Sequence, residues 1–179
     1  MKKIQRASHF LCLLFKSICW LLPIAIAFLT FFKIDVMIGY GMFDRIVSSS
    51  QIYSTNYSFL HKLMIFSIQL LPLSITLLIC HKLARLFHLY EKGVLFEIEN
   101  ITIIRQISVF MIVGELLQLI YQPLITAALS FNNPAGQRFV SITLGSTNAS
   151  TLITAFVILI ASWIVKEAHQ LKNDVQLTI

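Results

Sequence analysis

Four long apolar segments, separated by shorter polar stretches, constrain the fold of this chain more than any other feature of its sequence. The first runs from Phe10 to Phe32 and is interrupted only by Lys16 and Ser17. About 20 predominantly apolar residues are enough for a helix to cross the hydrocarbon core of a bilayer. The 179 residues are 12% charged, whereas soluble domains average about 25%. The sequence therefore predicts an all-α protein, an integral membrane four-helix bundle in contact with lipid.

We expect a single transmembrane domain over residues 1–179. The predicted helices cover about 10–32, 63–90, 101–130 and 151–172, and two loops at 33–62 and 131–150 connect them on one side of the membrane. The second of these loops contains an alternating segment, Gln137 to Leu144, which predicts a short strand.

The distribution of basic residues predicts the orientation in the membrane. Ten Lys and Arg lie in the N-terminal segment, the stretch between the second and third helices and the tail, and four lie in the other two loops. The positive-inside rule then places both termini in the cytosol, and we expect the bacterial cytoplasmic (inner) membrane. The net charge of +6 has the same explanation. Since the basic residues form no continuous face, we expect no direct contact with nucleic acid.

The second and third helices are predicted to be longer than the membrane is thick. At 1.5 Å per residue, helices over 63–90 and 101–130 are about 42 and 45 Å long, whereas the hydrocarbon core needs about 30 Å. We therefore expect both helices to extend into a cytosolic hairpin over residues 81–106. Gly93 is the predicted turn residue of this hairpin, and Asn100 is the predicted N-cap of the helix that follows.

Short motifs in this hairpin carry a resemblance to a known family. They are Gly93-Val94-Leu95-Phe96-x-x-x-Asn100, then Ile104-Arg105, and a chain end that reads Gln176-Leu177-Thr178-Ile179. The chain resembles a bacterial family of four-helix membrane proteins of unknown function. Many of its members are encoded beside a small Cro-type helix-turn-helix regulator, which implies a regulatory partnership with such a protein. The chain departs from the family at Glu97, where Ser or Thr is usual.

Five residues of the hairpin are candidates for partner binding: Arg85, Gly93, Phe96, Asn100 and Arg105. In one interpretation, Phe96 is an apolar anchor for a cytosolic protein. Arg105 is then a charge contact, or it clamps the hairpin by pairing with Glu97 or Glu99. In the other interpretation, the same five residues only turn, fill and cap the hairpin. The leading hypothesis is a membrane-anchored regulatory or scaffold protein that docks a partner through residues 81–106 and the C-terminal tail.

A polar stripe inside the predicted membrane helices is a second candidate site, formed by Gln69, Glu115, Gln118 and Gln122. Glu115 is its most informative member, because a carboxylate in the bilayer is costly and often functional. The stripe could serve a small transporter, channel or ligand sensor, and four helices would form a pore only as a homo-oligomer. The alternative is polar contact between helices. A third hypothesis is a structural subunit of a larger membrane complex.

The third group consists of thiols and imidazoles near the predicted inner face: His9, Cys12, Cys80, His81 and His88. Thiolate and imidazole suit zinc or copper, but the spacing matches no established ligand set. We therefore expect no metal and no cofactor, although the sequence leaves open whether this group binds one. The chain also lacks a phosphate-binding glycine loop, a nucleophile–base pair and paired carboxylates in a cleft, so we expect no enzyme.

Overall fold

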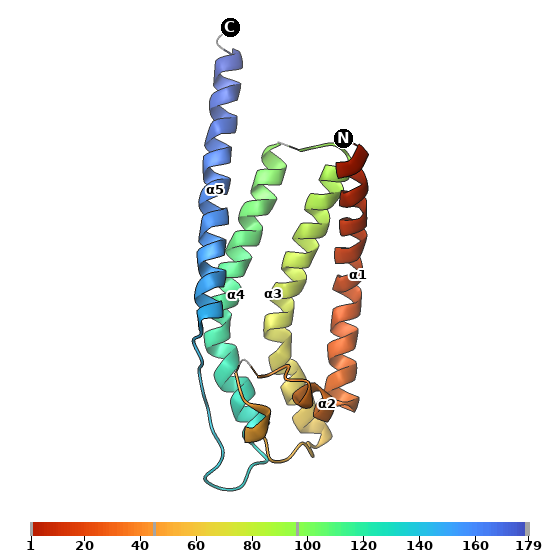
Figure 1. Cartoon of the computed structure of the whole chain (residues 1–179), viewed down its shortest axis with the longest axis vertical. Helices are drawn as coiled ribbons and strands as arrows, with labels where there is room; N and C mark the ends of the chain where they lie inside the picture. Colours follow the sequence, from red (N-terminus) through yellow and green to blue (C-terminus); the bar gives the residue numbers. More distant parts are fainter. Residues whose placement is uncertain (1, 45, 96, 178–179) are drawn as a thin grey trace. The chain divides into compact units, whose positions relative to one another are not determined.

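The computed structural model describes residues 2–44, 46–95 and 97–177 (Figure 1). Side chains are described from Ile4 to Leu171, apart from positions 45, 49, 96, 146 and 147. The elements in chain order are α1 (Lys2–Phe32), α2 (Ile34–Gly39), the 3-10 turn η1 (Ser49–Gln51), α3 (Phe59–Glu91), α4 (Ile98–Ser130) and α5 (Ser146–Leu177). These described residues contain no strand.

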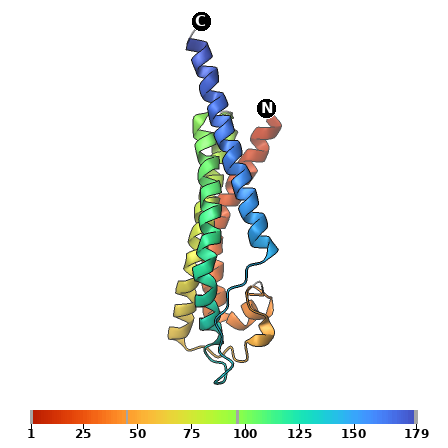
Figure 2. The same cartoon turned by 90° about the vertical axis from the view of Figure 1, so that its left-hand side faces the viewer.

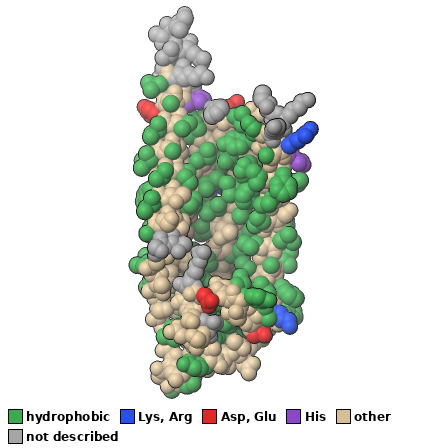
Figure 3. Space-filling view, viewed as in Figure 1, with side chains coloured by type: hydrophobic (Ala, Val, Ile, Leu, Met, Phe, Trp, Pro, Cys, Tyr) green, Lys and Arg blue, Asp and Glu red, His purple; other side chains and the backbone are tan. Residues whose placement is uncertain are grey.

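Four of the helices are long and apolar enough to cross a membrane. The candidate spans are Ile4–Phe32, Phe59–Glu91, Ile98–Ser130 and Asn148–Leu171. At most 22% of the most apolar window of any of them is buried by the protein itself. Figure 3 shows hydrophobic side chains spread over the outer surface of these helices. Such a surface needs an apolar solvent, so the prediction of an all-α, multi-pass membrane protein is confirmed.

The observed helices begin earlier than predicted. The first begins at Lys2, because its opening residues, such as Gln5, Arg6 and Ala7, are good helix formers that a search for apolar residues misses. The fourth begins at Ser146. Each of the first three membrane helices also contains a proline, Pro23, Pro72 or Pro123, and continues through it.

Two compact units share these helices. The first unit comprises Met1–Cys19, Ile75–Glu115 and Ser146–Ile179, and the second comprises Trp20–Ser74 and Leu116–Gly145. Helices α1, α3 and α4 each contribute to both units. The expected single domain over residues 1–179 therefore stays a prediction.

The core of the second unit is built from α3, α4 and the short helix α2. Ile65, Ile125 and Leu129 are fully buried there, and Ile34 and Met37 of α2 pack against the same cluster. The loop after α1 is therefore folded onto the helices. Burial raises the pKa of Tyr57 in this loop to about 12, and its hydroxyl donates a hydrogen bond to the carbonyl of Leu129 (2.7 Å).

The prediction of a short strand at 137–144 is wrong. This stretch is extended, but it has no neighbouring strand, as Figure 2 shows for the chain between α4 and α5. It lies instead along α4, whose Gln122, Thr126 and Ser130 recur every fourth residue and so share one face. Their oxygens accept the backbone N–H groups of residues 143, 141 and 139 at 2.6, 3.1 and 3.1 Å. The alternating sequence does form an extended backbone, but this backbone bonds to one face of α4 and not to another strand.

Candidate functional site

The end of α3 is fixed by backbone geometry at Gly93. Its φ of +83° lies in the left-handed region, which favours glycine. The N–H of Gly93 bonds to the carbonyl of Tyr90 (3.1 Å), and the N–H of Val94 bonds to that of Leu89 (3.1 Å). These two bonds form a Schellman motif, in which a left-handed residue satisfies the last carbonyls of a helix. The predicted turn at Gly93 is confirmed.

Asn100 does not cap the helix that follows. The carbonyl of Glu97 accepts the N–H groups of Asn100 (3.0 Å) and Ile101 (3.4 Å), so α4 begins at Ile98 and Glu97 takes the N-cap position. Asn100 is 2% exposed and donates its side-chain N–H to the carbonyl of Val94 (2.8 Å). It therefore links the connecting loop to the first turn of α4. The sequence did not predict this role, because asparagine is also a common N-cap residue.

An ion pair links α3 to α4 near this turn. Arg85 Nη2 lies 2.6 Å from Glu99 Oε1, and the two side chains are 55% and 44% exposed. Glu99 thus pairs with Arg85, and the clamp between Arg105 and Glu97 or Glu99 is absent from the ion pairs of the described residues, whereas a contact of Arg105 with a partner stays a prediction. Arg105 is half-buried, and it makes no ion pair with any residue that the structure describes.

An apolar cluster lies beneath the ion pair. Leu86 of α3 packs with Ile103 and Ile107 of α4, and all three are buried. Phe15 of α1 stacks on Phe87 of α3 with ring centroids 5.8 Å apart. Three of the five predicted partner-binding residues, Arg85, Gly93 and Asn100, therefore contribute to holding this end of the first unit together. Phe96 and the side chains from residue 172 onward lie outside the described residues.

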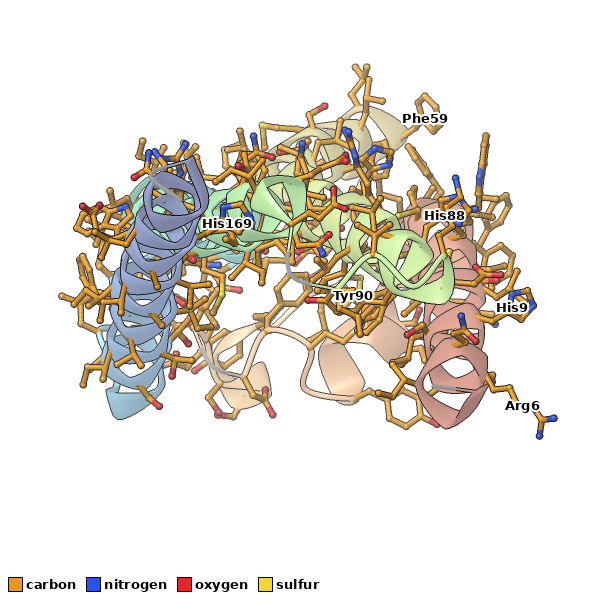
Figure 4. All side chains as sticks on the ribbon, turned by 90° about the horizontal axis from the view of Figure 1, so that it is seen from above. Arg6, His9, Phe59, His88, Tyr90 and His169 are labelled. Atoms are coloured by element: carbon orange, nitrogen blue, oxygen red, sulfur yellow. The ribbon has the colours of Figure 1, made fainter. Side chains whose placement is uncertain are left out.

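An open cavity of about 570 Å³ lies where α1 meets the end of α3. It is lined by Gln5, Arg6, His9 and Glu91. His9 Nδ1 lies 2.9 Å from Glu91 Oε1. Figure 4 shows the Arg6 side chain extending away from α1. The four lining residues all carry polar or charged groups, which distinguishes this cavity from the apolar helix surfaces.

Metal-type ligands gather beside this cavity. One ligand atom each of Cys12, His88 and Glu91 lies within 4.8 Å of the other two. Two of these residues were singled out from sequence and are brought together, whereas Cys80 and His81 lie outside the group. Glu91 was missed. The signal that could have found it is the matching spacing of His9 with Cys12 and of His88 with Glu91, each three residues apart on a helix.

The residues of the predicted polar stripe have separate partners. Gln69 is 5% exposed and accepts a hydrogen bond from the Thr30 hydroxyl (3.1 Å). Glu115 Oε2 accepts one from the side-chain amide of Asn148 at the start of α5 (2.7 Å). Gln122 accepts from the backbone of the extended stretch, as described above. The fourth member, Gln118, is half-buried. The stripe thus contributes hydrogen bonds that join different segments.

These observations define the class of the protein: a multi-pass, four-helix membrane protein whose α3–α4 turn is held by internal contacts. Residues 45–179 match the family described as a protein of unknown function (DUF2975), and the chain belongs to that family. The resemblance inferred from the motifs at 93–105 and at the chain end is confirmed. No curated protein and no solved structure matches the chain.

Proposed function

We propose that this protein is a membrane-anchored regulatory or scaffold protein that holds a cytosolic partner at the α3–α4 connection, residues 81–106. The observation that carries the proposal is the open cavity beside this connection, whose lining includes the charged side chains of Arg6 and Glu91 together with Gln5 and His9. The apolar surfaces of the membrane helices suit contact with lipid. The open cavity with its charged side chains suits contact with a soluble protein instead.

The internal contacts of the connection support this proposal. The Schellman motif at Gly93, the Asn100 bond and the Arg85–Glu99 pair stabilise the observed backbone conformation. A preorganised surface loses less conformational entropy when a partner binds. The cationic side chains of Arg6 and Lys92 remain exposed. They favour a partner with an acidic contact surface.

Charge and the family resemblance support a proposed cellular location. The positive-inside rule places residues 81–106 and both termini on the cytosolic side, and the resemblance favours the inner membrane of a bacterium. It also implies a candidate partner, the small helix-turn-helix regulator encoded beside many family members. Under this proposal the partner contacts DNA, and the membrane protein does not.

The polar stripe is better explained by structure than by transport. Gln69, Glu115 and Gln122 are each hydrogen-bonded to a different segment of the chain. These bonds favour polar contact between helices over a transporter, channel or ligand sensor. A structural subunit of a larger complex would instead copurify with a fixed membrane partner.

The proposal is tested by binding in nanodiscs. The purified full chain is titrated with a small helix-turn-helix regulator of the kind encoded beside many family members, and the double variant Arg6→Glu plus Lys92→Glu is compared with the natural sequence. We expect the dissociation constant to rise about tenfold or more, since each tenfold corresponds to about 1.4 kcal/mol. Lys33→Glu is the matched control, because Lys33 is an exposed cation of the second unit. Equal binding by all three proteins, or no binding by any, contradicts the proposal.

A further inference from the structure

We propose that Cys12, His88 and Glu91 form a binding site for a divalent transition-metal ion of the zinc type. The three residues come from two helices of the first unit. Cys12 lies on α1, and His88 and Glu91 lie on the last turn of α3. Their ligand atoms lie within 4.8 Å of one another. Glu91 and His9 also line the cavity on which the docking proposal rests. The metal site is nevertheless tested with ions alone and does not require that proposal.

The chemistry of the three ligands selects the class of ion. A thiolate and an imidazole prefer borderline or soft transition metals, whereas magnesium and calcium take oxygen ligands. Zinc is bound by Cys sulfur at about 2.3 Å, by His nitrogen at about 2.0–2.1 Å and by carboxylate oxygen at about 2.0–2.2 Å. The thiol of Cys12 loses one proton when the ion binds. Together with the carboxylate of Glu91, the thiolate then balances the two charges of the ion.

The distances fit this class of site. Around a tetrahedral zinc ion, ligand atoms are separated by about 3.3–3.8 Å, as the bond lengths require. The observed separations of up to 4.8 Å therefore need only small side-chain rotations. His88 and Glu91 have side chains 46% and 34% exposed, so neighbouring atoms leave room for these rotations. Cys12 is 3% exposed and fixed by packing, which positions one ligand in advance.

His9 completes the site as a residue that orients a ligand. Its Nδ1 lies 2.9 Å from Glu91 Oε1, whereas Glu91 Oε2 points toward His88, 3.5 Å from its Nδ1. In Figure 4, the labelled His9 and His88 lie on neighbouring ends of α1 and α3. A hydrogen bond to the outer oxygen of a ligating carboxylate fixes its orientation, and loss of such a bond weakens metal binding about 10- to 100-fold.

The open cavity provides a path for the ion. Its wall includes His9 and Glu91, so one side of the proposed site faces solvent. Three protein ligands with an open fourth position characterise zinc sites that bind a water or an exogenous molecule. The ion would also join α1 to α3 at the end of the first unit.

The experiment is a titration of the purified full chain in nanodiscs, with any affinity tag removed, using Zn²⁺ and Co²⁺ alone. We expect one ion per chain and a Co²⁺ spectrum that contains a thiolate charge-transfer band. Cys12→Ser abolishes the band, and His88→Ala or Glu91→Gln weakens Zn²⁺ binding by more than about tenfold. His9→Ala weakens Zn²⁺ binding about 10- to 100-fold, and the thiolate band of the Co²⁺ spectrum is retained.

The matched controls are Cys80→Ser and His81→Ala. Both residues lie on α3, as His88 and Glu91 do, but outside the metal-ligand cluster. They leave the affinity and the band unchanged. The absence of a thiolate band in the natural protein overturns the proposal, as does an equal loss of affinity in Cys80→Ser. Circular dichroism without metal reports whether each variant folds. If Cys12→Ser does not fold, the exposed His88→Ala and Glu91→Gln variants decide the question, and unchanged Zn²⁺ affinity in both overturns it.

Discussion

Asn133 connects two segments of the loop region in the second unit, and its substitution tests how that region is held. The side chain is 2% exposed. Its amide N–H groups donate to the carbonyls of Gln51 (2.8 Å) and Gln137 (3.1 Å), and its oxygen accepts the N–H of Tyr53 (3.1 Å). The three backbone groups belong to two stretches more than 80 residues apart in sequence. Asn133→Leu removes all three bonds and keeps a side chain of similar length.

The expected cost follows from those three bonds. A buried polar group left without a partner costs about 1–3 kcal/mol, and partly buried groups, such as these, regain some of it from water. We therefore expect a loss of about 2–4 kcal/mol of unfolding free energy. For a chain of this size that corresponds to a fall in melting temperature of about 5–15 °C.

The assay is thermal unfolding in detergent micelles, followed by circular dichroism. The neighbouring Asn132→Leu is the matched control, because Asn132 makes one exposed hydrogen bond, to the carbonyl of Asn56 (3.0 Å). We expect this control to cost less than about 1 kcal/mol. If both variants lower the melting temperature equally, the three-bond account of Asn133 is refuted.

Three further predictions concern single contacts. Gln122→Leu leaves a backbone N–H of the extended stretch without its acceptor and should cost about 1–3 kcal/mol in the same unfolding assay; an equal loss in Gln118→Leu would contradict this account. Gly93→Ala should cost about 1–2 kcal/mol, because alanine is strained at positive φ while space for its Cβ is available. A double-mutant cycle on Arg85→Ala and Glu99→Ala should give a coupling energy below about 1 kcal/mol, since both side chains are half exposed, and a larger coupling would show that the pair is shielded from water.

The sequence predicted the membrane helices well, because the signal for a spanning helix is long and tolerates local exceptions. An apolar run of about 20 residues is still recognised as a spanning helix when it contains an interruption such as Lys16 or a proline such as Pro72. Its ends are less certain, since the first helix begins at Lys2, eight residues before its predicted start at residue 10. The turn at Gly93 was also predictable, since few residues other than glycine adopt a positive φ at low cost.

The contacts of polar side chains were much harder to predict. Asn100 has the chemistry of an N-cap, yet a carbonyl of the preceding loop lies within its reach and takes its hydrogen bond. The alternation at 137–144 correctly indicated an extended backbone, but sequence does not reveal that its partner is a row of oxygens on α4. Glu91 was overlooked because its importance depends on the approach of His9 and Cys12 from another helix.

The central proposal is that the α3–α4 connection faces the cytosol, where a partner can reach it. The most direct test is labelling of Lys92→Cys, in a chain whose three natural cysteines are replaced by serine, with a membrane-impermeant maleimide. Lys92 is exposed at the end of α3, so its thiol is accessible to reagent from one side of the membrane. We predict no labelling in intact cells and full labelling after the membrane is permeabilised. Labelling in intact cells would place the connection outside and contradict the account.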